Sequence, residues 1–226
     1  GFPGCLSKVL ITKLPKFLMC TINAFSMVTN FIKFLEQNFH LPSEKFDKLE
    51  KYITCKSFSK GDYLVRQGDV ITDTFFIEKG LVRMYSVDPS GKEHILQFAC
   101  ENRIVLDRSS VYFNKPSQFF VDAIEDTVTV SFNQSLLDVL HEIQPETVKN
   151  NELLLQNHIR HLQFRINMLL SASAEERYLD FIKQFPDLTL RVPQWMIASY
   201  LGITPESLSR VRKTLADKNF KPSHKL

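Results

Sequence analysis

The spacing of apolar residues changes twice along the chain and divides it into three kinds of structure. From Phe31 to Tyr52, apolar side chains recur every three or four positions, which predicts helix. From about Lys56, short runs rich in β-branched and aromatic residues alternate with turn residues. From about Glu146 the helical spacing returns and continues to Leu215. The pattern therefore predicts a leading helical unit, a middle region of strands and a helical C-terminal part.

The middle region has the pattern of an antiparallel sheet protein. Its short apolar runs are separated by turn residues such as Gly68-Asp69 and the segment Asp88–Gly91, where proline presets one turn position and glycine takes another. Short strands separated by turns every 8–12 residues or so are typical of a sandwich or barrel. The predicted strands are residues 63–65, 74–77, 81–87, 94–99, 119–124 and 128–132.

A single long helix is predicted over residues 146–170. Its apolar positions mostly follow alternating steps of three and four residues, which is the spacing of a coiled coil. This spacing predicts a dimer seam, and a helix buried within one chain is the alternative. Leu153, Leu154, Phe164 and Met168 lie off the seam, and we expect them to pack against the strands. The seam residues are Val148, Leu155, Ile159, Leu162, Ile166 and Leu169.

The stretch Pro193–Leu215 predicts two short helices joined by a tight turn. Residues 195–201 form the first helix, and Gly202 supplies the positive φ of the turn. Thr204 is a good N-cap for a second helix that begins at Pro205. A short cationic helix braced by an apolar partner is how a helix-turn-helix enters the major groove of DNA. An ordinary helical hairpin with a solvated basic face is the alternative.

Composition and charge argue against a membrane-spanning chain and against a chain that is basic throughout. Hydrophobic residues at 44% and charged residues at 23% are ordinary for a soluble globular protein. The net charge is only +3, but Lys and Arg clearly outnumber Asp and Glu from Arg191 onward, as expected for a C-terminal unit that meets phosphates. No apolar run approaches the roughly 18 residues of a membrane span, so we expect a cytoplasmic protein without membrane contact.

Scattered cysteines argue against metal sites and disulfides. Without a Cys-x-x-Cys pair, we expect no disulfide framework, no zinc or iron–sulfur site and no cofactor. His158 and His161 share a helix face but lack a third ligand nearby, so we expect no metal there. The cysteines are Cys5, Cys20, Cys55 and Cys100.

The first 26 residues resemble a signal peptide only superficially. Lysines precede a partly apolar stretch, but Thr21 and Asn23 interrupt it and no small-residue cleavage site follows. The chain also begins with Gly1 instead of methionine. We therefore expect residues 1–26 to be a non-native or upstream-encoded extension, with the native domain beginning near Met27.

Taken together, the middle region and the C-terminal stretch resemble the Crp/Fnr type of transcription regulator. Residues 61–99, GDYLVRQGDVITDTFFIEKGLVRMYSVDPSGKEHILQFA, are similar to its cyclic-nucleotide-binding β-roll, and residues 193–215 to its helix-turn-helix. The resemblance covers about residues 30–216. It implies an α+β fold with an N-terminal antiparallel β-roll, a long dimerisation helix and a C-terminal winged helix-turn-helix domain.

On that basis we assign residues 27–145 to the β-roll with its flanking helices, 146–172 to the dimerisation helix and 173–226 to the DNA-binding domain. Residues 171–173 break the seam and are expected to act as a hinge. The family usually adds a β-hairpin wing at the end, but residues 217–226 are short, basic and poor in strand signals. We therefore expect a truncated or absent wing.

The resemblance also locates a candidate effector pocket. In the family a Gly-Glu pair holds the ribose of a cyclic nucleotide and an Arg-Ser pair holds its phosphate. Leu106-Asp107 and Pro116-Ser117 stand near those positions, so the glycine and the arginine are absent and cyclic AMP binding is not expected. The aromatic residues here, Tyr112 and Phe113 included, are interpreted as barrel packing, with a pocket for an unknown ligand as the alternative. The candidate pocket residues are Asp107, Arg108, Tyr112, Ser117, Gln118 and Phe119.

Base-reading positions implied by the resemblance are Pro205, Glu206 and Arg210. Glu206 can accept a hydrogen bond from cytosine N4 and Arg210 can grip guanine, so a G·C pair is the expected target. The other candidate DNA contacts are Thr204, Ser207, Ser209, Arg212 and Lys213.

The sequence thus predicts a homodimeric transcription regulator that binds palindromic DNA. RNA polymerase is an expected partner, and a small-molecule effector of unknown identity is allowed for. One alternative is a ligand-binding module whose C-terminal helices contact other proteins. The other is an enzyme, but the sequence offers no nucleophile–base constellation or phosphate loop, so we do not expect one.

Overall fold

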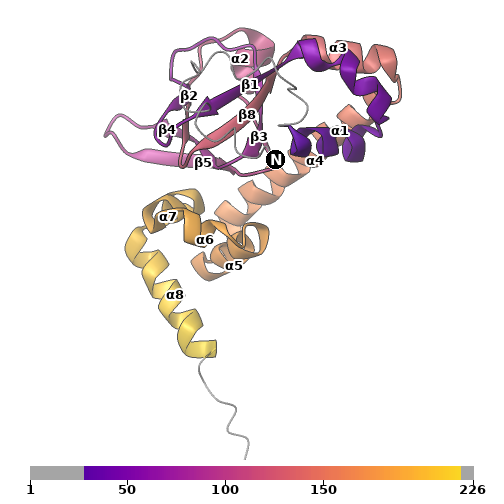
Figure 1. The fold of residues 1–226 in the computed structure, drawn as a ribbon. Helices are drawn as coiled ribbons and strands as arrows, with labels where there is room; N and C mark the ends of the chain where they lie inside the picture. The colour runs from indigo at the N-terminus through magenta and orange to yellow at the C-terminus, as the bar shows by residue number, and fades with distance from the viewer. Residues whose placement is uncertain (1–27, 220–226) are drawn as a thin grey trace, which may run out of the picture.

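Two antiparallel sheets of four strands face each other in the N-terminal half (Figure 1). The structure is a computed structural model and describes residues 28–219. The strand order is β1-β8-β3-β6 in one sheet and β2-β7-β4-β5 in the other. The strands are β1 Ile53–Phe58, β2 Tyr63–Val65, β3 Thr74–Lys79, β4 Val82–Val87, β5 Glu93–Ala99, β6 Ile104–Val105, β7 Phe120–Ala123 and β8 Thr127–Phe132.

All six predicted strands are present, which confirms the antiparallel β-roll and the α+β fold. The sequence pattern missed β1 and β6. Strand β1 pairs with β8 from Ile53 opposite Phe132 to Phe58 opposite Thr127, at the edge of its sheet. Its sequence, ITCKSF, alternates half-buried and exposed positions and so carries little apolar signal. Strand β6 is only two residues long.

Successive residues of β3 and β4 point to opposite faces, as the pleat requires. Phe75 and Ile77 of β3 meet Val82 and Met84 of β4 between the two sheets. Phe76 points the other way, into a second core beneath the helices. Between these strands Gly80 has φ +100°, and a Cβ there would lie 2.5 Å from the Thr127 hydroxyl, so only glycine fits this turn.

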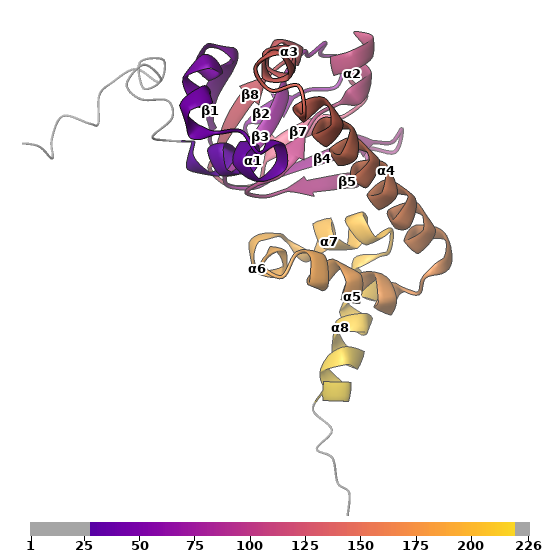
Figure 2. The ribbon, with the colours of Figure 1, turned by 90° about the vertical axis from the view of Figure 1, so that its right-hand side faces the viewer.

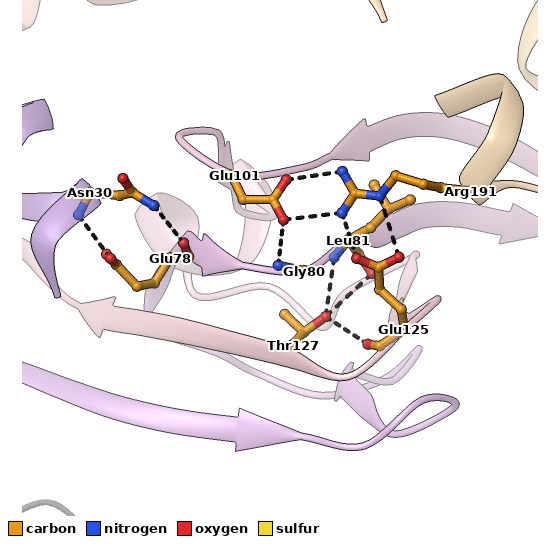
Figure 3. Close-up of polar contacts among 8 residues, drawn as sticks. All are labelled: Asn30, Glu78, Gly80, Leu81, Glu101, Glu125, Thr127 and Arg191. Atoms are coloured by element: carbon orange, nitrogen blue, oxygen red, sulfur yellow. Dashed lines mark hydrogen bonds and ion pairs between the residues drawn. The ribbon is translucent and has the colours of Figure 1, made fainter. Parts of the chain in front are cut away.

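The leading helical unit and the helices after β8 cover the outer face of the first sheet. Helix α1, Thr29–Phe39, begins against Glu78, whose carboxylate accepts from the backbone N–H of Asn30 at 2.8 Å (Figure 3). It also accepts from the Phe31 N–H at 2.9 Å. This buried carboxylate caps the helix from another element. The helix predicted after Pro42 is instead two 3₁₀ turns, Ser43–Lys48 and Glu50–Tyr52. The other helices of the roll are α2 Arg108–Phe113 and α3 Gln134–Ile143.

Helix α4, Thr147–Ser171, leads from the β-roll to the C-terminal unit, as predicted from its spacing. Ala172 is extended, and Ser173 begins α5, Ala174–Gln184, with a capping box in which Ser173 and Glu176 bond each other's backbone. The break between the two helices is therefore fixed by hydrogen bonds at the predicted hinge position.

Three further helices complete the C-terminal unit: α6 Leu188–Arg191, α7 Gln194–Leu201 and α8 Pro205–Asn219. Helix α6 was not predicted. Because α8 continues to Asn219, the start of the segment assigned to a wing is helical. The rest of that segment and the predicted extension at residues 1–26 lie outside the described residues. Within residues 28–219 no helix is long and apolar enough to cross a membrane.

The C-terminal unit packs directly on the β-roll, below β5 (Figure 2). Leu81, Tyr85, Ile95 and Phe98 of the roll share one core with residues of α5, α6, α7 and α8. The Ser199 hydroxyl of α7 donates to the Glu93 carbonyl at 2.9 Å and accepts from the Ile95 N–H at 3.1 Å. The two units therefore form a continuous junction.

Candidate nucleic-acid interface

The turn between α7 and α8 has the geometry that the sequence predicts. Gly202 adopts the left-handed conformation with φ 66° and ends α7. The Thr204 hydroxyl accepts from the Ser207 backbone N–H at 3.2 Å, so Thr204 is the N-cap of α8 and Pro205 is its first residue. Leu208 is fully buried, and Val211 packs beside it in the junction core. Only one side of α8 is therefore attached to the body.

The opposite side of α8 carries four of the predicted contact residues. At about 100° per residue, Glu206, Ser209, Arg210 and Lys213 project away from Leu208, and all four are exposed. Arg212 is also exposed but falls on a flank, next to the buried side. Figure 1 shows the C-terminal part of α8 extending away from the other described elements.

Hydrogen bonds prearrange the first turn of α8. The Arg210 guanidinium donates to the Ser207 hydroxyl at 3.2 Å, and this hydroxyl also lies 3.3 Å from that of Thr204. Hydrogen bonds from its own backbone N–H and from the Thr204 hydroxyl hold the pKa of Glu206 below its ordinary value. Glu206 is therefore an ionised acceptor at neutral pH, beside the cationic donor Arg210.

Two cations of the C-terminal unit are paired with carboxylates, so they add little to its positive charge. Arg191 donates to Glu101 at 3.0 and 3.1 Å and to Glu125, two carboxylates of the β-roll (Figure 3). Lys218 pairs with Glu175 at 2.7 Å. Arg191 contributed to the predicted phosphate-binding charge, but it instead ties α6 to the roll. The hydrogen bonds from Arg191 to Glu101 and Glu125 could not be foreseen, because the partners lie far apart in sequence.

Sequence reasoning also missed a buried ion-pair cluster on the roll surface that faces α7. Arg83 of β4 donates from Nε and Nη2 to the two oxygens of Asp122 at 2.8 and 2.9 Å, and also to Glu93. Despite the cost of burial, these partners raise the pKa of Arg83. Its guanidinium lies over the rings of Tyr85, at 4.2 Å, and Trp195 of α7, at 5.4 Å. The cluster joins the sheet to the start of α7.

The predicted seam of α4 forms an exposed apolar stripe. Its six residues are between 40% and 57% exposed: Val148, Leu155, Ile159, Leu162, Ile166 and Leu169. Of the four apolar residues expected to pack on the strands, Leu154 contacts the core under the helices, and Met168 lines a cavity at the junction. The expectation was wrong for Leu153, and although Phe164 lines the same cavity, these two residues are 61% and 45% exposed. They lie on the side of α4 opposite the seam.

Two residues of the candidate effector pocket have structural roles. Asp107 is buried and caps α2 by accepting from the Ser109 N–H at 2.9 Å, while its second carboxylate oxygen has no hydrogen-bond partner among the described residues. The buried Ser117 hydroxyl bonds the backbone of Phe119 at 3.1 Å. These bonds shape the segment between β6 and β7 without leaving the hydroxyl free.

The aromatic residues of that pocket separate into two groups. Phe119 packs against the interior of the roll, as expected. Tyr112 and Phe113 are 49% and 71% exposed, so their interpretation as barrel packing was wrong: α2 lies on the surface and turns them outward. Gln118 is exposed and Arg108 half-buried. The structure therefore does not gather the six predicted residues around one cavity.

Three histidines, on β5 and α4, lie in different surroundings. His94 is exposed on β5 and bonds Asp88 at 2.8 Å. Burial lowers the pKa of His158, and Arg108 and His161 lower it further. Within residues 28–219 no three side chains of His, Cys, Asp or Glu are grouped to hold a metal ion.

Comparisons with known proteins extend over both units. Residues 55–143 match the family model of the cyclic nucleotide-binding domain. The chain is 26% identical to the anaerobic regulatory protein of Pasteurella multocida over 185 residues, which cover 76% of this chain and 67% of that protein. It is equally identical to the fumarate and nitrate reduction regulatory protein of Vibrio cholerae, covering 76% and 73%.

Solved structures share the fold. FixK2 from Bradyrhizobium japonicum matches with a TM-score of 0.63 and 20% identity, over 77% of this chain and 89% of that chain. The catabolite activator protein of Thermus thermophilus matches with a TM-score of 0.50 and 21% identity, over 80% and 87%. The order of β-roll, long helix and C-terminal helices is therefore an arrangement found in known proteins.

Proposed function

Because the chain is of the Crp/Fnr type by sequence and fold, we propose that it is a transcription regulator that binds palindromic DNA sites as a homodimer. One observation carries the proposal: the free face of α8 presents Arg210 and Lys213 to solvent with no carboxylate paired to either among the described residues. A cationic helix face held clear of the body matches the shape and charge of the major groove.

In this proposal some residues of α8 contact DNA bases and others contact phosphates. Arg210 grips the N7 and O6 of guanine and Glu206 accepts from the N4 of cytosine, which together select a G·C pair. Ser209 and Lys213 lie beside them on the same face. Pro205 keeps the base-reading position that the resemblance implies. Thr204 and Ser207 at the start of the helix and Arg212 on its flank face the phosphates, where they position α8 on the duplex.

The seam of α4 supplies the second copy. Its exposed apolar residues would leave water if two α4 helices paired, and the coiled-coil spacing suits a parallel pair. Two reading helices related by a two-fold axis bind half-sites one helical turn apart, about 34 Å. Contact with RNA polymerase in the cytoplasm completes the proposed role.

Cyclic AMP is not the proposed effector. The match to the cyclic nucleotide-binding domain describes the fold of the roll, whereas Pro116 stands where the resemblance expects the arginine that binds the phosphate. A buried cyclic phosphate needs a bidentate cation. Asp107, near the position of the ribose-binding pair, is committed to capping α2.

Sedimentation analysis combined with DNA binding tests the dimer. Leu162→Glu places a charge in the seam, whereas Leu153→Glu places the same charge at an exposed position on the opposite side of α4. We expect the wild type and L153E to sediment as dimers and to bind genomic DNA fragments with affinity that falls steeply as salt rises. L162E should be monomeric and bind DNA at least about tenfold more weakly.

Two results would contradict the proposal. If the wild type were monomeric, the α4 seam would not pair two copies. If the wild type did not bind DNA, or bound it with an affinity insensitive to salt, α8 would not be a DNA-reading helix. If L153E lost the dimer and L162E kept it, the pairing face of α4 would be the other one.

A further inference from the structure

A cavity of about 210 Å³ lies where four elements meet at the junction. Its walls come from β5 and the following loop, from the C-terminal half of α4, from α5 and from the end of α7, which converge below the roll in Figure 2. Much of the wall is apolar, with Phe98, Met168, Phe181 and Phe185 among its residues. The cavity is distinct from the candidate pocket beside α2.

Two guanidiniums of this cavity converge on the end of α7. Arg165 of α4 donates to the Tyr200 carbonyl at 3.0 Å, and Arg177 of α5 donates to the next carbonyl, Leu201, at 2.8 Å. Arg165 also lies 3.6 Å from the centre of the Tyr200 ring. Because consecutive carbonyls accept these bonds, the two cations are held side by side. A third arginine, Arg103, also lines the cavity.

Capping of α7 accounts for only part of this arrangement. A guanidinium has five N–H donors, and the Nε of Arg177 is buried with no hydrogen-bond partner among the described residues. Burial lowers the pKa of Arg165, since the carbonyl partner does not restore the solvation that the cation loses. Both guanidiniums are half-buried, and a charge withdrawn from water is ordinarily paired.

Carboxylates are scarce around the three arginines. Among the described residues, none of Arg103, Arg165 and Arg177 has a carboxylate oxygen within 4.0 Å. Asp180 is the one acidic residue among those that line the cavity, and its side chain accepts from Gln184. The cavity therefore has an excess of positive charge and an unused donor.

We propose that this cavity binds a small organic anion, whose carboxylate or phosphate bonds Arg165 and Arg177 and whose apolar body lies against the aromatic wall. Paired guanidiniums match the geometry of such an anionic group. The volume is below the roughly 300–1,000 Å³ of sites for drug-sized ligands, which limits the body to a single ring or short chain. A neutral molecule of the same shape would leave both cations without a counter-charge.

An occupant of this cavity would contact the roll, the dimerisation helix and the DNA-binding unit together. Two seam residues, Leu162 and Leu169, also line this cavity, so pairing of two α4 helices would occur at its edge. Calorimetry detects binding to the chain whatever its oligomeric state or DNA affinity, so the binding proposal can fail while the proposed function holds, and the reverse.

Titration calorimetry on the full chain tests it with three probes. Benzoate has both the anionic group and an apolar ring, inorganic phosphate has only the anion, and benzyl alcohol has only the ring. We expect saturable binding of benzoate, weakened about tenfold or more by Arg165→Gln or Arg177→Gln. The matched control Arg66→Ala removes an exposed arginine of the roll that does not line the cavity, and it should leave benzoate binding unchanged.

Asp180→Asn keeps every arginine and removes the lining carboxylate, so it should tighten benzoate binding several-fold. If the arginine variants do not fold, binding of benzoate to D180N still tests the proposal. Absence of benzoate binding, equal affinity for benzyl alcohol, no tightening in D180N, or loss of binding in R66A alone would each overturn the proposal. Phosphate binding as tight as that of benzoate would overturn the apolar part of the ligand assignment.

Discussion

The two ends of α7 hold arginines in opposite ways. Near its start, Arg83 and Arg191 are each bonded to two carboxylates, and these bonds lock the helical unit to the roll. At its end, Arg165 and Arg177 bond only backbone carbonyls and face a cavity. The same residue type thus serves as a structural fastener at one end and remains available to a ligand at the other.

The arginines of the two proposed binding surfaces have no carboxylate partner among the described residues. Arg210 on α8 belongs with the unpaired group, since its described hydrogen bond is to the Ser207 hydroxyl and not to a carboxylate. Buried ion pairs are expensive to break and exposed unpaired cations are cheap to remove. We therefore expect that removing a paired arginine or its carboxylate lowers the free energy of unfolding. Removing an arginine without a carboxylate partner should instead weaken ligand or DNA binding.

The largest effect on stability is expected at the paired end. Asp122→Ala leaves the Arg83 guanidinium buried, with its side chain only 9% exposed and one carboxylate partner lost. The free energy of unfolding should fall by about 3–5 kcal/mol, as for other broken buried pairs. Urea denaturation followed by circular dichroism measures it. The double variant Arg83→Met with Asp122→Leu should recover much of the lost unfolding free energy. If D122A lowered the unfolding free energy by less than about 1 kcal/mol, the Arg83–Asp122 pair would be effectively solvated.

At the reading helix the effect should appear in DNA affinity with the fold intact. Arg210→Ala should cost about 1–3 kcal/mol on the preferred site and relax the choice at one base position. Fluorescence anisotropy on a set of single-base variants of the site measures both. Arg212→Ala is the matched control on the flank and should weaken binding to all sequences alike. Equal weakening on every sequence by R210A would reassign Arg210 to phosphate.

The smallest effect is expected at the partly exposed pair of Arg191. Burial alone would raise the pKa of Glu101, but hydrogen bonds from Arg191, from its own backbone N–H and from the Gly80 N–H, together with the Arg191 charge, outweigh it and hold the pKa below its usual value of 4.5. A lowered folded-state pKa means that Glu101 contributes stability above about pH 4.5 and loses it as the pH falls through the folded value. Arg191→Met should therefore cost under about 1 kcal/mol at pH 7.

The same variant should flatten the dependence of unfolding free energy on pH below about 4.5. Denaturation of the wild type and R191M at several values between about pH 3 and 7 measures this. Parallel pH profiles for the two proteins would show that Glu101 gains nothing from Arg191.

Features set by neighbouring residues were predictable from the sequence. Gly202, Thr204 and Pro205 form the turn and cap that their chemistry requires, and the spacing of α4 gives its length to within a residue or two. Features set across long separations were not. Arg191 bonds Glu101, which lies 90 residues earlier, and neither position carries a local signal.

The cavity and the pocket beside α2 also could not be predicted from local sequence. The cavity is formed by four elements, and its arginines are separated by the breaks between helices, so no motif marks them. Tyr112 and Phe113 are apolar in type but are placed on the outer side of a surface helix. Their exposure depends on where α2 lies, which residue type alone does not determine.

Selection of bound DNA from a random pool tests the central claim most directly. The wild-type chain should enrich palindromes whose half-sites are about 10–10.5 base pairs apart, centre to centre, with a G·C pair at the same position in each half. The same selection with Arg210→Ala should lose the preference at that pair. Enrichment of no sequence, or of single half-sites without symmetry, would contradict a paired reader built on α4 and α8.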